Sequence, residues 1–187
     1  MKTTFRIILT VWVGVALFAC NQNPKAATDT QSTSNESSQP QGQASVIDDT
    51  SSPNILQIAI GSADHSTLVA AVQAATLENV LVNAGPLTVF APTNEAFAKL
   101  PAGTVEDLLK PENKSALANI LKYHVTPGNY SKEFLKKFKK LGQANNGSVE
   151  VEVKGDDIYV GGAKIIASIP ASNGIIHVVD QVMLPKE

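Results

Sequence analysis

Two apolar stretches that lie far apart in the sequence constrain the fold of this chain most tightly. The first, residues 87–99, reads LTVFAPTNEAFAK, and the second, residues 172–185, reads SNGIIHVVDQVMLP. Leu87 to Ala91 is a short apolar run that ends at Pro92, which predicts a buried strand. Ile175 to Leu184 is apolar on both faces, which is typical of a central strand. Each stretch therefore predicts a strand inside the protein.

The remaining pattern places helices first and strands last. Apolar positions at helical spacing and breakers such as Gly85-Pro86 predict helices over residues 55–60, 68–75, 78–83, 95–100, 104–109, 113–123 and 131–137. Alternating or short apolar runs predict strands over residues 149–154, 158–160, 164–169 and 175–184. We expect Thr93 or Asn94, a Thr104–Asp107 capping box and Ser131 to begin three of the helices. Helices followed by strands indicate the α+β class.

The two apolar stretches, with Tyr123-His124-Val125 between them, resemble the fasciclin-like domain, a family of extracellular adhesion and matrix modules. The resemblance covers roughly residues 53–185 and contains one copy of each motif, so it implies a single-domain member of the family. Together with the export signal described next, it identifies the chain as resembling a bacterial lipoprotein member. It implies an α+β fold, a compact wedge of two β-sheets packed with a helical layer. It also implies a non-enzymatic function in adhesion or matrix interaction.

The first nineteen residues predict an export signal. Lys2 and Arg6 precede an apolar run of about ten residues, which is too short to span a bilayer permanently. Cleavage after Ala19 is one interpretation. The other is a lipobox in which Cys20, the only cysteine, becomes the lipidated first residue. We expect the lipoprotein form, with residues 1–19 as the signal peptide and Cys20 as the lipidation site.

Residues 20–52 are polar and contain no aromatic side chain, so they cannot bury enough apolar surface to offset the entropy lost on ordering. They are expected to form a lipid-anchored disordered tether, which leaves residues 53–187 as the folded domain. In bacterial lipoproteins an asparagine after the lipidated cysteine, here Asn21, permits transfer to the outer membrane. We therefore expect a membrane partner through the anchor and a place in the bacterial envelope, with the outer membrane favoured, on the periplasmic or outer face.

Composition excludes several functions. Arg6 is the only arginine and Trp12 the only tryptophan, and both leave with the predicted signal. The remaining chain is acidic and lacks a guanidinium group, so nucleic-acid binding is not expected. The three histidines lie more than fifty residues apart, and no P-loop, G-x-S-x-G or H-E-x-x-H motif is present. We expect no enzyme activity, no metal site and no cofactor.

Tyr123 and His124 match a tyrosine–histidine pair that the family uses for adhesion, notably toward integrins, so the resemblance implies that both residues bind a partner. The spacing offers another interpretation, because His124 follows Leu117, Ile120 and Leu121 on one helical face. A histidine in that position is expected to be buried, neutral and hydrogen-bonded.

The second integrin motif of the family is an aspartate–isoleucine pair, which Ser168-Ile169 replaces here. Because the carboxylate is missing, integrin binding by that route is not expected. His177 lies in an apolar strand and is expected in the core, and Asn173-Gly174 is expected to form a turn that tolerates positive φ.

Asp64-His65-Ser66 contains the residue types of a hydrolase triad, but adjacent side chains point in different directions and cannot form a proton relay. We expect Asp64, Ser66 or Thr67 to cap a helix instead.

A basic run follows the predicted cap at Ser131. Phe134, Leu135 and Phe138 within this run are expected to face the core. The charged side chains form either a solvated helix face or a patch for anionic polysaccharide or lipid headgroups. They are Lys132, Lys136, Lys137, Lys139 and Lys140.

The sequence thus predicts a non-enzymatic adhesion module whose partner is an extracellular protein or polysaccharide. The alternative is a small-ligand or lipid carrier that uses an apolar cleft between sheet and helices. A hydrolase is the weakest hypothesis, because the chain carries no catalytic motif.

Overall fold

The computed structural model describes residues 52–83 and 85–185. The predicted signal peptide, Cys20 and nearly all of the predicted tether lie outside the described residues. None of the helices between residues 52 and 185 has the length and apolar character that crossing a membrane requires.

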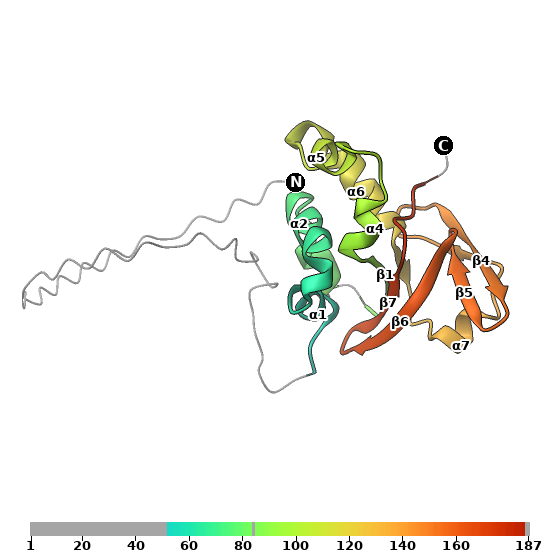
Figure 1. Cartoon of the computed structure of the whole chain (residues 1–187). Helices are drawn as coiled ribbons and strands as arrows, with labels where there is room; N and C mark the ends of the chain where they lie inside the picture. The colour runs from blue at the N-terminus through green and yellow to red at the C-terminus, as the bar shows by residue number, and fades with distance from the viewer. Residues whose placement is uncertain (1–51, 84, 186–187) are drawn as a thin grey trace, which may run out of the picture. The chain divides into compact units, whose positions relative to one another are not determined.

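Short helices dominate the first half of the domain (Figure 1). In three of them a side-chain oxygen accepts a bond from a free N–H of the first turn: Asn54 for α1, Thr93 for α4 and Ser131 for α7. The caps at Thr93 and Ser131 were predicted, and the cap at Asn54 was not. The helices are α1 (Ile55–Ile60), η2 (Ala63–His65), α2 (Ser66–Ala74), α3 (Glu78–Asn83), α4 (Asn94–Ala98), α5 (Thr104–Leu108), η3 (Pro111–Asn113), α6 (Lys114–Tyr123) and α7 (Lys132–Leu135).

The predicted capping box at Thr104 is wrong. Thr104 lies inside α5, and the residue before it, Gly103, is the cap, with φ +86° and no side chain to offer a bond. Several further boundaries differ from the prediction, among them the ends of α7 and of the final strand. Helix α7 ends at Leu135 instead of Lys137, and the final strand ends at Val179 instead of Leu184.

Seven strands are hydrogen-bonded in the order β2-β1-β7-β6-β5-β4-β3. All neighbours are antiparallel except β1 and β7, which are parallel and pair from Leu87 opposite Gly174 to Pro92 opposite Val179. The strands are β1 (Leu87–Pro92), β2 (Val125–Pro127), β3 (Lys140–Gly142), β4 (Ser148–Lys154), β5 (Asp157–Val160), β6 (Ala163–Ala171) and β7 (Gly174–Val179).

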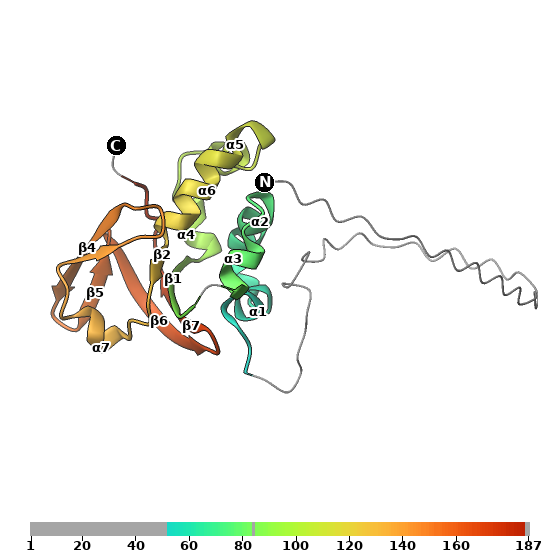
Figure 2. The same cartoon turned by 180° about the vertical axis from the view of Figure 1, so that it is seen from behind.

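The strands form one continuous order, but the sheet bends at β6. The start of β6 pairs with β5, its later residues pair with β7, and the register shifts between Ile165 and Ala167. A bulge of this kind increases local twist and turns a strand. Figures 1 and 2 show β4 and β5 turned away from β1 and β7, with α1 and α2 on the other side of the β1–β7 pair. The α+β class is therefore confirmed, and the expected two sheets are two leaves that share β6.

Two hydrophobic clusters lie on opposite faces of the β1–β7 pair. Val89 and Ile176 pack with helices α1, α2, α3 and α6 in the first cluster. Phe90 and Val179 pack with the second leaf in the other. Because both faces of the pair are covered, its strands are apolar throughout, as expected for central strands.

The parallel pair requires a glycine at residue 174. An added Cβ there would overlap the backbone carbonyl of Leu87, and Gly174 has φ +154°.

We predict that Gly174→Ala lowers the free energy of unfolding by at least about 2 kcal/mol, through backbone overlap at the centre of the sheet. Gly142→Ala is the matched control, because a Cβ at that position meets no atom within 4 Å. Urea unfolding measures both variants, and equal stability of the two would contradict this account of the pair.

Candidate functional site

His124 is a structural histidine that joins three segments. It is 3% exposed, and its Nδ1 donates to the Ile120 carbonyl at 2.9 Å while its Nε2 accepts the backbone N–H of Met183 at 3.0 Å. Its own carbonyl accepts the N–H of Phe90 at 2.9 Å. The side chain thus links α6 to the segment after β7, and the backbone carbonyl adds a bond to β1. The expectation of a buried, hydrogen-bonded residue agrees with this geometry, and direct contact with a partner stays a prediction that the burial does not favour.

Burial also fixes the protonation state of His124. Removal from water disfavours the imidazolium, and this lowers the pKa of His124 to about 4, with the Ile120 carbonyl opposing the shift. Both hydrogen bonds use the neutral ring, since one nitrogen donates and the other accepts. His124 is therefore uncharged at neutral pH.

Tyr123 is buried as well, and it belongs to the second hydrophobic cluster. Its hydroxyl donates to the Ser148 carbonyl at 3.2 Å, and burial, aided by the nearby Glu150 carboxylate, raises its pKa. The tyrosine and the histidine therefore face different neighbours, and the structure does not bring them together as one exposed motif.

The edge of the Tyr123 side chain reaches a polar groove with a volume of about 680 Å³. The groove lies between α6, the loop before β4, β4 itself and the Gly161-Gly162 turn. Its polar groups are mainly amides and carboxylates, to which Tyr123 adds a hydroxyl and Lys140 an ammonium group. The lining residues are Asn119, Tyr123, Lys140, Asn145, Asn146, Gly147, Ser148, Glu150, Glu152, Gly161, Gly162, Leu184 and Pro185.

Hydrogen bonds order one wall of this groove. The Asn145 amide donates to the Asn119 side-chain oxygen at 3.0 Å and accepts the N–H of Gly147 at 2.9 Å. On the other wall Lys140 stands opposite Glu150 in the β3–β4 register. The groove was not predictable from local patterns, because its walls come from segments spread over residues 119–185. The Asn145-Asn146-Gly147 turn was the one local signal of it.

The remaining predicted binding lysines lie beside α7, away from the groove. Lys136, Lys137 and Lys139 are exposed and Lys132 is half-buried. Lys136 forms an ion pair with Glu133 at 2.9 Å. Of the five predicted lysines, only Lys140 shares a site with Tyr123.

His177 is a second structural histidine, as predicted. It is fully buried, its Nε2 donates to the Tyr130 carbonyl at 2.8 Å and its Nδ1 accepts the Ser168 hydroxyl at 2.8 Å. Its ring stacks on Phe90, and burial lowers its pKa. Ser168, which replaces the aspartate of the family's integrin motif, is therefore a structural partner of this histidine.

The expected caps at residues 64–67 are wrong, because the cap comes from another helix. The Asn94 side-chain oxygen accepts the N–H of Thr67 at 3.0 Å, and its amide donates to the Ala63 carbonyl at 2.9 Å. His65 is buried, bonds to the Ser62 hydroxyl at 2.8 Å and has a pKa that burial lowers. Asp64-His65-Ser66 thus lies at the start of α2, and the Asn94 side chain holds this start against α4.

Asn173 has a larger role than the predicted turn. Its oxygen accepts the N–H of Ile55 at 3.0 Å, and its amide donates to the Leu81 carbonyl at 2.7 Å. The side chain therefore connects the start of α1 and the end of α3 to the β6–β7 turn. Because both partners are more than ninety residues away, no local pattern could reveal these bonds.

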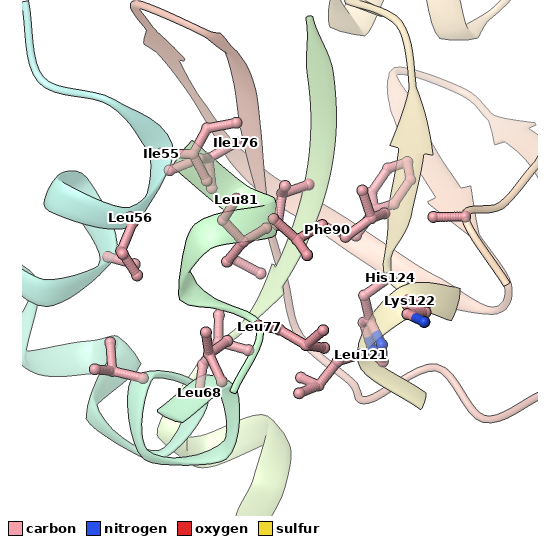
Figure 3. A pocket seen from close by; sticks show the side chains of 18 residues that line it. Ile55, Leu56, Leu68, Leu77, Leu81, Phe90, Leu121, Lys122, His124 and Ile176 are labelled. Carbon is pink, nitrogen blue, oxygen red and sulfur yellow. The ribbon is translucent and has the colours of Figure 1, made fainter. Parts of the chain in front are cut away.

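An apolar crevice lies between the helices and the β1–β7 pair (Figure 3). Leu56, Leu81 and Ile176 are among its lining residues, and Figure 3 shows Lys122 and His124 at one end. Its volume is about 50 Å³, far below the roughly 300 Å³ at which drug-sized ligand pockets begin. The crevice therefore does not accommodate a lipid chain, and it gives no support to the carrier alternative.

The titratable side chains of the described residues form no metal centre, since nowhere between residues 52 and 185 do three or more His, Cys, Asp or Glu side chains converge. Glu150 and Glu152, the two carboxylates of the groove, are exposed, and Glu152 is paired with Lys154 at 2.7 Å. Burial is one way in which a protein keeps a carboxyl protonated for acid catalysis, and neither of these exposed residues is buried.

Fold and site together define an α+β domain in which a bent sheet is covered by short helices, and in which histidine and asparagine side chains hold the segments together. The fasciclin domain model matches residues 63–185. The chain belongs to the fasciclin domain family. Fasciclin domains occur in cell-adhesion and extracellular-matrix proteins.

Relatives differ in how much surrounds the domain. Protein sll1483 of Synechocystis sp. is 43% identical over 186 residues, which cover 99% of each chain. Uncharacterized protein sll1735 of the same organism is 42% identical over 132 residues, which cover 71% of this chain and 98% of the relative. A solved FAS1 domain pair from the insect cell adhesion molecule Fasciclin I aligns with a TM-score of 0.48 and 18% identity, over 60% of this chain and 42% of that chain. The second relative consists almost entirely of the stretch that matches the domain of this chain.

We predict that His124→Ala lowers the free energy of unfolding at pH 7.5 by at least about 1 kcal/mol, because it leaves two backbone partners unpaired and a cavity. The folded-state pKa lies below that of an unfolded histidine, so the unfolded chain binds more protons. The stability from His124 is therefore complete above about pH 6.5 and is lost as pH falls toward 4.

Urea unfolding between pH 7.5 and 4.5 measures this contribution. The wild-type chain should lose stability on acidification, and His124→Ala should lose less, by up to about 3 kcal/mol. An unchanged midpoint at pH 7.5, or an identical pH dependence, would contradict the structural role of His124.

Proposed function

We propose that the protein is an exported, non-enzymatic adhesion module of the bacterial cell envelope, and that it binds a hydroxyl-rich extracellular polysaccharide in the polar groove. The observation that carries the proposal is the composition of that groove on a fasciclin domain. Amide and carboxylate side chains supply both donors and acceptors, which is what sugar hydroxyl groups require.

The groove suits a weak and repeated interaction. Its walls are open, and the Tyr123 ring is buried, so it offers a hydroxyl edge but no aromatic surface for a sugar ring to stack on. Affinity per site is then modest. Many copies displayed on one surface, each meeting a repeat of the same polymer, would give strong adhesion by avidity. An extracellular protein that presents polar side chains is the other partner class.

The groups that could perform chemistry serve the fold instead. All three histidines are buried and hydrogen-bonded, His65 within its own turn and His124 and His177 to other segments of the domain. The groove carboxylates stay exposed. These observations support a binding function over hydrolysis.

The polysaccharide proposal predicts a specific loss on substitution. Asn145→Ala with Glu150→Ala removes one amide and one carboxylate from opposite walls, and should weaken saturable binding of residues 52–187 to purified matrix polysaccharide about tenfold or more. Asn129→Ala with Glu106→Ala is the matched control, since both residues are exposed elsewhere. Equal binding by the two double variants would place the contact outside the groove.

The anchor is tested separately. Cells that express the full chain should incorporate an alkyne-labelled fatty acid into it, and Cys20→Ser should abolish the label and release the protein from the outer-membrane fraction. Label that persists in Cys20→Ser, or a wild-type chain that stays unlabelled and soluble, would contradict lipid anchoring.

A further inference from the structure

An aromatic side chain is exposed at α7, where the sequence predicts a core position. Phe134 is 41% exposed, whereas its neighbour Leu135 is fully buried. The Phe134 ring stacks on Tyr130 at 5.8 Å and meets the edge of Phe138 at 5.1 Å, measured between ring centres. Phe138 in turn contacts Tyr130 at 5.4 Å. The three rings support one another, so Phe134 is held at the surface by packing.

Positive charge is concentrated in the segment that carries this ring. Five of the eleven lysines between residues 52 and 185 fall in residues 132–140, with Glu133 as the single carboxylate there. The rest of that range carries six lysines against eleven carboxylates. The domain is therefore acidic apart from one basic region. Lys140 lines the groove, and we call the rest of that region the α7 face: Lys132, Phe134, Lys136, Lys137 and Lys139.

One lysine is coupled directly to the exposed ring. The Lys137 Nζ lies 5.3 Å from the centre of the Phe134 ring, within the range of a cation–π contact. An aromatic side chain next to a lysine is typical of the membrane interface. There the ring enters the acyl boundary and the lysine amine stays at the level of the phosphates.

The α7 face is also separate from the groove. Figures 1 and 2 both show α7 at one end of the second leaf and the C-terminal segment, which contributes Leu184 and Pro185 to the groove, toward the other end. A partner on the α7 face therefore leaves most of the groove accessible.

We propose that the α7 face docks on an anionic phospholipid bilayer, with Phe134 inserted at the acyl boundary and the surrounding lysines against the headgroup phosphates. Charge complementarity supports an anionic partner. The exposed phenylalanine favours a bilayer over a hydrated polyanion, because only a bilayer offers an apolar layer for the ring to enter. Docking on a membrane in the cell rests on the proposed export of the protein. Binding of the α7 face to an anionic bilayer in vitro does not depend on export.

The test uses residues 52–187, which contain both hydrophobic clusters and match a relative that is little more than this domain. Trp12 is the only tryptophan of the chain, so Phe134→Trp gives a fragment with a single reporter. With phosphatidylglycerol-containing vesicles its emission should shift to the blue and be quenched by brominated acyl chains. Phosphatidylcholine vesicles, or 0.5 M salt with the anionic vesicles, should suppress the shift.

Two matched controls identify the face. Ile166→Trp places a reporter at a position that is 57% exposed on β6, and its emission should not shift. In the Phe134→Trp background, K136Q/K137Q/K139Q should weaken vesicle binding about tenfold or more, whereas K110Q/K114Q/K122Q, with the same change in charge, should not.

Three outcomes would overturn the proposal: no blue shift with anionic vesicles, an equal shift for Ile166→Trp, or equal loss in the two lysine variants. Salt-sensitive binding to an anionic polysaccharide without vesicle binding would also overturn it, and would assign the face to a polymer. Because groove binding is measured on a separate ligand with separate variants, failure here leaves the proposed adhesion function standing.

Discussion

The parallel pairing of β1 with β7 is the constraint on which the rest of the structure depends. These strands lie almost ninety residues apart, and they meet only because Gly174 lets its backbone approach Leu87 closely. Closing so long a connection has an entropic cost, which burial on both faces of the pair offsets. The helices pack on one face and the second leaf on the other, so neither hydrophobic cluster forms without this pair.

Two half-buried asparagines and two buried histidines then fix what packs around the pair. Asn94 follows β1 and bonds to the start of α2, and Asn173 precedes β7 and bonds to α1 and α3. His124 and His177 do the same for α6 and for the Tyr130 segment. Each bond satisfies a backbone group that would otherwise be buried unpaired, and this specifies one arrangement of the helices on the sheet.

Local patterns predicted the parts of the fold that depend on neighbours in sequence. Apolar spacing located α1, α2 and α6, and the spacing before His124 correctly indicated a buried histidine. Features set by distant segments were not predictable in this way. Phe134 is exposed because Tyr130 and Phe138 hold it outward, and the groove combines α6 with the loop before β4. The cap on α2 comes from Asn94, twenty-seven residues from Thr67.

The residues that build the domain are therefore distinct from those proposed to meet a partner. Tyr123 and His124 belong mainly to the first group, and the groove to the second. Amide chemical-shift mapping of residues 52–187 during titration with matrix polysaccharide tests this separation most directly. Saturable shifts at Asn119, Asn145 and Gly161, with the amides of α1 and α3 unchanged, are predicted. Shifts confined to the helical layer around the apolar crevice, or none at saturating polymer, would contradict it.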